Sequence, residues 1–325
     1  MIQDQRRLLL QGLLHGLWLP LGAGLLPAAA PAQPPQPGAA LSALDLSPAQ
    51  AGRQRAERDE AALRALPKDL KLVKPGVLSV AIHAAVPPTS FYANDARTII
   101  GADVDHAQLL ADALGLKLEI ISIAWPDWPL GLSSGKYDAV IANVGVTEQR
   151  KERFDFSTYR AGLHGFFVRK DSPIQSIREP RDIAGLRVIT GSGTIQERIL
   201  LEWNRLNQAA GLKAAELLYF DDATAARLAL LSGRADANFN PHAPLAYMAA
   251  QEGRSRLVGT VNAGWPLKAD VAVTTRKGSG LAAAFTVATN TLIANGKYAR
   301  TLARWGLSAE ALARSETNPP GLARL

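Results

Sequence analysis

The sequence predicts an α/β fold built as two lobes. Three observations lead to this prediction: the chain of 325 residues is long enough for two domains, strand-like apolar runs alternate with helix-like segments from about Val77, and two segments resemble each other. The alternation of strands with helices indicates βαβ units and parallel sheets. Apolar residues make up 47% of the chain, as expected of a globular protein with a sizeable core.

The predicted elements follow one another in a regular rhythm. Strands are predicted at 78–84, 116–124, 137–143, 166–171, 186–190, 215–220 and 235–240. Helices are predicted at 104–116, with Gly115 at the C-terminal end, at 196–206 and at 223–233, with a short helix or turn at 127–135. Residues 281–307 have the pattern of terminal helices.

The two segments that resemble each other are 132–144 and 230–242. Each has a helix-ending glycine, then a basic residue and an aspartate, and each runs along a predicted strand to an asparagine. The matching pairs are Gly135 and Gly233, Asp138 and Asp236, and Asn143 and Asn240. Because ligands of open α/β sheets bind beyond the carboxyl ends of the strands, we expect the two asparagines on opposite walls of a cleft.

The N-terminus has the features of a secretory signal peptide. Arg6 and Arg7 precede a long apolar stretch that ends at the small-residue site Ala30-Pro31-Ala32. We therefore expect residues 1–32 to be removed and the mature protein to be soluble in the periplasm; an uncleaved membrane anchor is the alternative. The arginine pair leaves open whether export follows the general or the twin-arginine route. Residues 33–75 form a predicted lead-in segment with a short surface helix.

The composition argues against several classes of function. The formal net charge is +7, but the basic residues are scattered along the chain, so we expect no nucleic-acid partner. The chain contains no cysteine, which excludes disulfides and thiolate catalysis. The five histidines do not have metal-ligand spacing, and the glycine-rich segments do not match phosphate-binding or dinucleotide-binding motifs. We expect no metal and no cofactor.

A strand–turn–helix junction at 187–200 is a candidate anion site. Gly191 and Gly193 permit a tight turn that a ligand can approach closely. Thr194 and Glu197 have the spacing of a capping box, which predicts a helix beginning at Thr194. The unpaired N–H groups of a helix N-terminus attract anions. An ordinary capped helix is the alternative.

Arg150 follows the third predicted strand within a dense charge cluster. Thr147 can cap a helix over 147–153, which would put Arg150 in the first turn. A cation there opposes the helix dipole unless it meets an anion, and a guanidinium can hold a carboxylate through two parallel hydrogen bonds. The alternative is a surface ion pair of Arg150 with Glu148 or Asp155.

Five segments together resemble a known family. In chain order they are GVLSVAI, IIGADVDHAQLLADALGLKLEI, SGKYDAVIANVGVTEQRKERFDFSTY, DIAGLRVITGSGTIQE and LALLSGRADA. They are similar to family 3 extracellular solute-binding proteins, the periplasmic amino-acid receptors of ABC importers, from about Gly76 to Gly306. The block V-T-x-x-R-x-x-x-x-D-F-S is the most specific part. The resemblance implies a type II periplasmic binding protein, in which two α/β lobes joined by a two-strand hinge trap a ligand.

The resemblance also implies domain boundaries and a ligand site. Lobe 1 would comprise 76–165 and 265–310, lobe 2 would comprise 166–264, and a C-terminal tail would follow at 311–325. Arg150 matches the arginine that binds the ligand carboxylate, and Gly145 and Ile195 match residues whose N–H groups help to hold it. Trp125 matches an aromatic residue against the ligand side chain, and Asn143 a polar residue near the ligand's amino group. The other expected binding residues are His83, Thr147, Gly193, Thr194, Asn240 and His242.

Three positions depart from the amino-acid-binding pattern. His83 stands where an acidic residue is common, Val86 replaces an aromatic residue, and Pro241 replaces the aspartate that pairs with the ligand's ammonium group. Burying an ammonium without a counter-charge is costly. We therefore expect a carboxylate-bearing solute, either an amino acid whose amino group is held by neutral acceptors or a less polar organic acid.

These features favour a periplasmic receptor without catalytic activity. It would bind an amino acid or a related small carboxylate as a monomer and deliver it to an ABC permease in the inner membrane. The alternative is a periplasmic dehydratase of the cyclohexadienyl dehydratase type, with His83 or His242 protonating the departing hydroxyl; both histidines can equally be ordinary polar residues. The sensor domain of a receptor is a third alternative. Against it, the sequence after the N-terminal apolar stretch contains no segment that is long and apolar enough to span a membrane.

Overall fold

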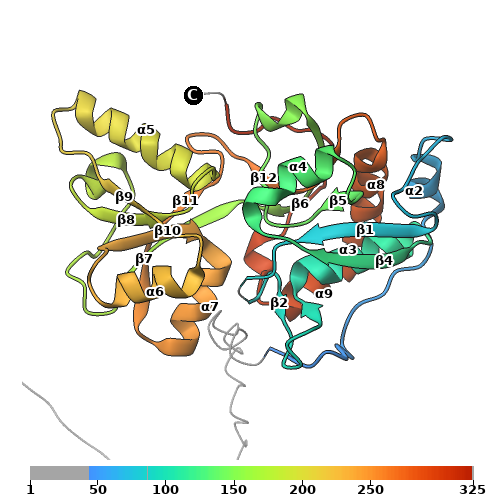
Figure 1. Cartoon of the computed structure of the whole chain (residues 1–325), viewed down its shortest axis with the longest axis horizontal. Helices are drawn as coiled ribbons and strands as arrows, with labels where there is room; N and C mark the ends of the chain where they lie inside the picture. The colour runs from blue at the N-terminus through green and yellow to red at the C-terminus, as the bar shows by residue number, and fades with distance from the viewer. Residues whose placement is uncertain (1–43, 86, 324–325) are drawn as a thin grey trace, which may run out of the picture. The chain divides into compact units, whose positions relative to one another are not determined.

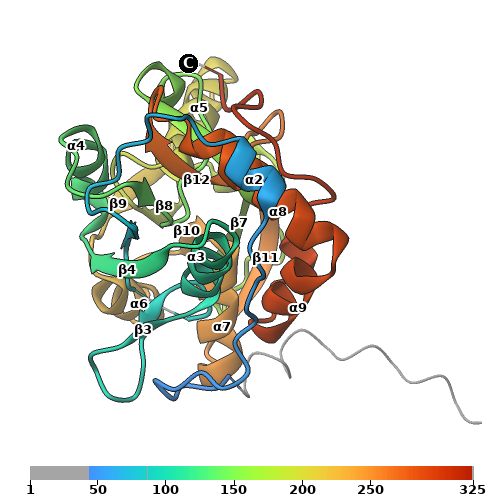
Figure 2. The same ribbon diagram turned by 90° about the vertical axis from the view of Figure 1, so that its right-hand side faces the viewer.

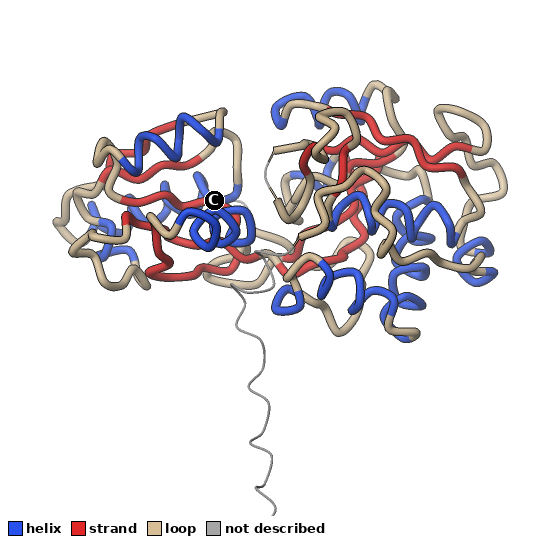
Figure 3. Tube along the Cα trace, turned by 90° about the horizontal axis from the view of Figure 1, so that it is seen from below, coloured by secondary structure: helices blue, strands red, loops and turns tan. Residues whose placement is uncertain are grey.

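The structure, a computed structural model, describes residues 44–85 and 87–323. The predicted signal peptide and position 86, where a valine replaces the expected aromatic residue, lie outside the described residues. Two five-stranded sheets form the centres of two lobes, and helices lie on both sides of the strands in each lobe (Figures 1 and 3). This arrangement confirms the predicted fold class. Within 44–85 and 87–323, no helix is long and apolar enough to cross a membrane.

Lobe 1 is built on a sheet with the strand order β4-β1-β5-β12-β6. Strand β1 lies parallel to β4 and β5, whereas β12 runs antiparallel to β5 and β6. The strands are β1 (Val77–Ile82), β4 (Lys117–Ser122), β5 (Ala139–Val140), β6 (Phe154–Ala161) and β12 (Asp270–Arg276), with a small β2 (Phe91–Tyr92) and β3 (Ile99–Ile100) pair beside them. The helices are α2 (Glu60–Arg64), α3 (Ala102–Ala113), α4 (Trp128–Ser133), α8 (Leu281–Ala294) and α9 (Lys297–Arg304), with the short 3-10 helices η1 (Trp125–Asp127), η2 (Arg150–Glu152) and η4 (Ser308–Glu310).

Lobe 2 is built on a sheet with the strand order β11-β7-β10-β8-β9. Strand β8 lies parallel to β9 and β10, and β7 pairs antiparallel with β10 and β11. The strands are β7 (Leu163–Arg169), β8 (Arg187–Thr190), β9 (Glu216–Tyr219), β10 (Ala237–Pro241) and β11 (Ser255–Asn262). The helices are α5 (Ile195–Ala209), α6 (Ala223–Leu231) and α7 (His242–Glu252), with the 3-10 helix η3 (Pro180–Ile183).

Two connections join the lobes. Strand β6 of lobe 1 continues through Gly162 into β7 of lobe 2, and residues 263–269 return the chain from β11 to β12. A Cβ atom on Gly162 would lie 2.5 Å from the carbonyl oxygen of Ala269, so the two connections approach each other closely there. A side chain at position 162 would force them apart.

The internal likeness seen in the sequence corresponds to one structural unit used twice. In lobe 1, the backbone N–H of Asp138 donates to Ser79 O, and the Asp138 carboxylate accepts from Ser79 N, both at 2.9 Å. In lobe 2, Asp236 makes the same pair of hydrogen bonds with Arg187, at 2.9 and 2.8 Å. Each aspartate therefore fastens the turn after a helix to a strand of its own sheet, β1 or β8.

Helix α5 shows how the local sequence specifies an element. The Thr194 hydroxyl accepts a hydrogen bond from Glu197 N at 3.2 Å, which caps the helix. The buried residues Ile195, Ile199 and Trp203 recur every four positions, so they form one apolar face, and all three belong to the hydrophobic core of lobe 2. The predicted start of this helix is confirmed.

The predicted helix over 147–153 is wrong. The chain instead makes a turn followed by the three-residue η2, in which Arg150 is the first residue. The hydroxyl of Thr147 still accepts from Arg150 N at 3.0 Å, so the predicted capping contact forms without the helix. Two constraints leave no room for a helix: β6 begins at Phe154, and the backbone of Val146 and Thr147 pairs with residues of β12 and of the C-terminal segment.

The predicted lead-in segment packs on lobe 1 over the part that is described. Helix α2 lies against α8 (Figure 2). Arg53 Nε donates to the buried carboxylate of Asp105 at 2.6 Å, and Arg55 forms two hydrogen bonds with Asp112, at 2.6 and 2.7 Å. Both aspartates belong to α3, so this segment is anchored to the lobe by charge-assisted hydrogen bonds.

Candidate functional site

A cavity of about 320 Å³ is lined by residues of both lobes. Its volume lies in the range of small-molecule sites in proteins, roughly 300–1,000 Å³. Eight of the expected binding residues line it: His83, Trp125, Asn143, Gly145, Arg150, Thr194, Ile195 and Asn240. The other three, Thr147, Gly193 and His242, are not among the lining residues. Several lining residues follow strands, among them His83 after β1, Asn143 after β5 and Thr194 after β8, as expected of an open α/β site.

Arg150 lines the cavity, and its hydrogen-bond partners are backbone carbonyl groups. Its Nη1 donates to Gly145 O at 2.9 Å, and its Nη2 lies 3.5 Å from Gly193 O, which belongs to lobe 2. The guanidinium carbon is 5.8 Å from the ring centre of Trp125 and 5.5 Å from that of Trp128, within cation–π distance. The part of the chain that the structure describes contains no salt bridge to Arg150.

The predicted alternative, a surface pair of Arg150 with Glu148 or Asp155, is not formed. Glu148 pairs with Lys151 at 2.9 Å, and the carboxylate of Asp155 accepts from Gly278 N and from the side chain of Asn318. Both carboxylates are therefore directed to other groups.

The electrostatic surroundings of Arg150 disfavour its positive charge. Burial, and then the nearby charge of Arg198, lower the pKa of Arg150 to about 10. A guanidinium removed from water and left without a counter-ion is energetically costly. A carboxylate in the cavity would supply the missing negative charge through two parallel hydrogen bonds.

The N-terminus of α5 lies next to Arg150. The N–H of Gly193 donates to the Glu197 carboxylate at 2.6 Å, so this amide is already occupied. By contrast, among the described residues we find no acceptor for the N–H groups of Gly145 and Ile195. A Cβ on Gly145 would lie 2.4 Å from Cδ1 of Ile195, which shows how closely the two lobes approach at this point. Two free amides and one guanidinium therefore border the same part of the cavity.

Two asparagines occupy the ends of the duplicated unit. Asn143 has a positive φ of 56°, and its amide oxygen accepts from Arg160 Nη2 at 2.6 Å. Asn240 donates through Nδ2 to Asn238 Oδ1 at 2.7 Å, which leaves the Asn240 amide oxygen available as an acceptor. Both side chains line the cavity, one from each lobe, as the sequence predicts.

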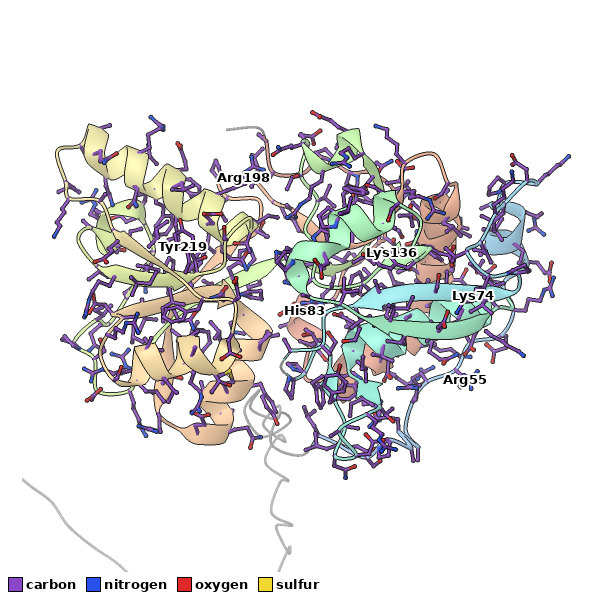
Figure 4. The ribbon with its side chains drawn as sticks, viewed as in Figure 1. Arg55, Lys74, His83, Lys136, Arg198 and Tyr219 are labelled. Carbon is purple, nitrogen blue, oxygen red and sulfur yellow. The ribbon has the colours of Figure 1, made fainter. Side chains whose placement is uncertain are left out.

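The two expected histidines differ in position. His83 follows β1 and faces the other lobe (Figure 4), and its Nδ1 lies 3.2 Å from Ile123 O. His242 begins α7 and lies 4.0 Å from the Glu310 carboxylate. Burial lowers the pKa of His242, although Glu310 opposes this shift, so the ring is neutral at neutral pH.

Sequence analysis did not single out several residues that line the cavity. Four of them are buried polar residues: Asp103, His164, Gln196 and Asn238. Lobe 2 also contributes an apolar group to the lining: Phe220, Pro244, Leu245 and Met248. Gln196 directly follows Ile195 in the capped turn, so that motif could have indicated it. The other residues reach the cavity through the tertiary fold, and no local sequence pattern predicts their positions.

Comparison with known proteins decides the family. Residues 78–308 match the bacterial extracellular solute-binding proteins, family 3. The chain belongs to this family. The resemblance found in the sequence is thereby confirmed, and the match covers both lobes.

Individual relatives share about a quarter to a third of their residues with the chain. The L-cystine-binding protein TcyJ of Escherichia coli is 31% identical over 168 residues, which are 51% of this chain and 59% of that protein. The cyclohexadienyl dehydratase of Pseudomonas aeruginosa is 26% identical over 168 residues, again 51% and 59% of the two chains. The chain thus aligns with less than two thirds of either protein. A solved ancestral arginine-binding protein bound to arginine has a TM-score of 0.61 and 28% identity, over 71% of this chain and 98% of that one.

Proposed function

We propose that this protein is a periplasmic solute receptor that binds an amino acid or a related small carboxylate between its lobes and delivers it to an ABC importer. One observation supports the proposal most directly: Arg150 borders a cavity lined by both lobes, has no acidic partner among the described residues and lies beside two free amides. The family and the amino-acid-binding relatives support the same function.

The ligand's carboxylate would bind to Arg150 and to the N–H groups of Gly145 and Ile195. These groups belong to different lobes, so a bound carboxylate would connect them. A ligand shifts the equilibrium between two arrangements of the lobes only by the difference in its affinity for them. Contacts that the ligand makes with both lobes at once would therefore stabilise the arrangement that holds it. The ABC permease would then recognise that arrangement.

The amino group of an amino-acid ligand would be held by neutral acceptors. Pro241 stands where the family resemblance implies an aspartate, and Asn143 already accepts from Arg160. Asn240, whose amide oxygen has no donor among residues 44–85 and 87–323, is the acceptor that we propose. The apolar residues that α7 contributes to the cavity would contact the ligand's side chain.

Isothermal titration calorimetry tests the proposal. We expect purified protein to bind L-arginine, L-cystine or another α-amino acid of a panel, and to bind agmatine and cystamine far more weakly, because these amines lack the carboxylate. Binding of the amines as tightly as of the amino acids would contradict the role of Arg150. Native mass spectrometry of freshly purified protein would show a retained solute, and size-exclusion chromatography would test the proposed monomer.

Substitution of Arg150 separates its role from general stability. Arg150→Ala would leave a carboxylate unpaired in the cavity, which costs on the order of 2–5 kcal/mol, so the affinity should fall at least ~30-fold. Arg153→Ala is the matched control, because Arg153 is three residues away, is exposed and donates to Ser133 Oγ at 3.2 Å. An unchanged affinity of the Arg150 variant, or an equal loss in both variants, would exclude the proposed contact.

The proposed receptor performs no catalytic step, and a dehydratase is the alternative. The similarity to a cyclohexadienyl dehydratase favours this alternative, and His83 lines the cavity where an acid could act. Incubation with prephenate distinguishes the two functions. Formation of phenylpyruvate that is lost in a His83→Gln variant would replace the receptor proposal by the enzyme.

A further inference from the structure

The C-terminal segment runs from lobe 1 to the place where the two lobes meet. We define residues 311–323 as the C-terminal strap; they follow η4 and lie beyond the matched family region, 78–308. In Figure 1 the strap is the dark red segment at the top, between the lobe that contains α5 and the lobe that contains α4. The family match therefore does not assign a role to the strap, and any role has to be inferred from its contacts.

The first part of the strap is fixed to lobe 1. Ser315 is fully buried, and its hydroxyl donates to Thr158 O at 2.6 Å. Further on, Asn318 N donates to Phe156 O at 3.0 Å, so the strap follows β6. All of these partners belong to lobe 1, so this part of the strap is attached to lobe 1 alone.

The next part of the strap holds the segment that carries Arg150. Leu322 N donates to Val146 O, and Glu148 N donates to Leu322 O, both at 3.0 Å. Gly321 N donates to the Glu148 carboxylate at 2.9 Å, and Lys151 Nζ donates to Pro319 O at 3.1 Å. These bonds bracket Arg150 on both sides in the sequence. A Cβ on Gly321 would lie 2.5 Å from Val146 O, so only glycine permits this approach.

The end of the strap contacts lobe 2. Leu322 is 3% exposed and belongs to the hydrophobic cluster of lobe 2, together with Ile195 and Ile199 of α5. Arg198, labelled on α5 in Figure 4, donates through Nη2 to Ala323 O at 2.8 Å. Leu322 therefore pairs with the Arg150 segment through its backbone and packs into lobe 2 through its side chain.

We propose that Leu322 is a positioning residue that joins the Arg150 segment to the start of α5 and so sets the affinity for the ligand. Leu322 does not line the cavity, so it acts through Arg150 and Ile195 and not by contact with the solute. This inference rests on the proposed function, because Leu322 would set the affinity of the same ligand site. A change that frees the strap lowers the fraction of molecules in the binding arrangement, and the apparent affinity falls by that fraction.

A matched pair of variants tests the strap. Leu322→Ala removes the contact with lobe 2, whereas Leu312→Ala shortens another buried leucine of the strap, 7% exposed, whose N–H donates to Tyr298 OH in lobe 1. Both variants should lower the melting temperature. Titration with L-arginine and L-cystine should show at least about 5-fold weaker binding for Leu322→Ala only, in the range of ordinary coupling effects. Leu322→Met should restore the affinity.

A measurement without ligand keeps this inference separate from the proposed function. Because the chain contains no cysteine, Lys136→Cys in lobe 1 and Lys213→Cys in lobe 2 provide two specific sites for spin labels. We expect Leu322→Ala, or the milder Leu322→Val if the alanine variant does not fold, to broaden the distribution of distances between the labels, and Leu312→Ala to leave it unchanged. Hydrogen exchange at 145–151 should accelerate in the same variant.

The outcomes decide between the two proposals. Unchanged distances and exchange in the Leu322 variants, or equal changes in the Leu312 control, would overturn the strap inference. If the wild-type protein binds no member of the amino-acid panel, the proposed function fails, while the label distances still decide whether the strap couples the lobes.

Discussion

Two arginines of lobe 1, Arg150 and Arg160, differ in their partners. Arg160 is 2% exposed, forms a buried salt bridge with Glu310 and donates to Asn143 Oδ1. Burial opposes the charge of Arg160, but Glu310, Tyr159 and Asp103 together outweigh this effect and raise the pKa of Arg160. Arg150 has no such partner among the described residues, and its pKa is lowered to about 10 by burial and by Arg198.

The contrast distinguishes a structural charge from the charge that we propose to bind the ligand. The charge of Arg160 is balanced by Glu310 within the protein, so its removal should damage the fold. Arg150 is incomplete without an anion, so its removal should affect binding more than folding. The following predictions test this distinction in order of decreasing effect.

Removal of Arg160 should have the largest effect on stability. Arg160→Ala leaves the Glu310 carboxylate, 4% exposed, buried without its partner, which typically costs about 3–5 kcal/mol. Chemical unfolding should show this loss. The double variant Arg160→Met/Glu310→Leu should recover most of the stability, because it removes both charges and keeps the side-chain volume. If it does not, the loss of stability comes from packing and not from an unpaired charge.

Acid should destabilise the region around Arg160 through two buried histidines. Burial, followed by the charge of Arg160, lowers the pKa of both His106 and His164 to about 3. Both are neutral in the folded protein and titrate near 6.5 when unfolded, so their contribution is complete above pH 6.5 and is lost as the pH falls toward 3. Each should reduce the free energy of unfolding by about 1.4 kcal/mol per pH unit in that window.

Asp103 partly offsets this loss. Burial raises its pKa to about 6, although Arg160 opposes the shift, so the folded protein keeps this proton and gains stability as the pH falls from 6 to 4. The net acid effect should therefore be close to that of one histidine. Unfolding curves between pH 7 and 5 check it, and His106→Phe/His164→Phe should reverse the slope. An unchanged slope would show that the histidines do not control it.

Loss of the Thr147 hydroxyl should have a moderate effect near Arg150. Thr147 is 1% exposed and caps the Arg150 segment, so Thr147→Val should cost about 1 kcal/mol of stability. Because this contact orients Arg150 N, the affinity for amino acids should also fall. Thr224→Val, at an exposed position of α6, is the control and should change neither quantity.

Removal of Arg150 should have the smallest effect on stability in the absence of ligand. Arg150→Met deletes a cation that burial already disfavours, so thermal unfolding should show no loss, or a slight gain. A destabilisation as large as that of Arg160→Ala would mean that the two arginines are both structural, and the distinction between them would fail.

Local patterns predicted much of the fold. The capping-box spacing of Thr194 and Glu197 predicted where α5 begins. The repeated aspartate indicated a unit that each lobe uses. These features depend on neighbours within a few residues or on one strand pair, which is why a single sequence reveals them.

Other features depend on residues far apart in the chain. Arg160 and Glu310 are separated by 150 positions, and neither belongs to a recognisable motif. The strap contains no periodic pattern, and its hydrogen bonds go to groups in segments far from it in the sequence. The predicted helix at 147–153 failed for the same reason: the Thr147 cap forms, but pairing with distant segments prevents a helix.

Asp138 and Asp236 each brace a single lobe, and neither hydrogen-bonds across the connection at Gly162. A rotation of one lobe against the other therefore need not break either brace. In the proposed receptor, the lobes would therefore move as two preformed units when a solute binds or leaves, and the contacts that change would be those between the lobes.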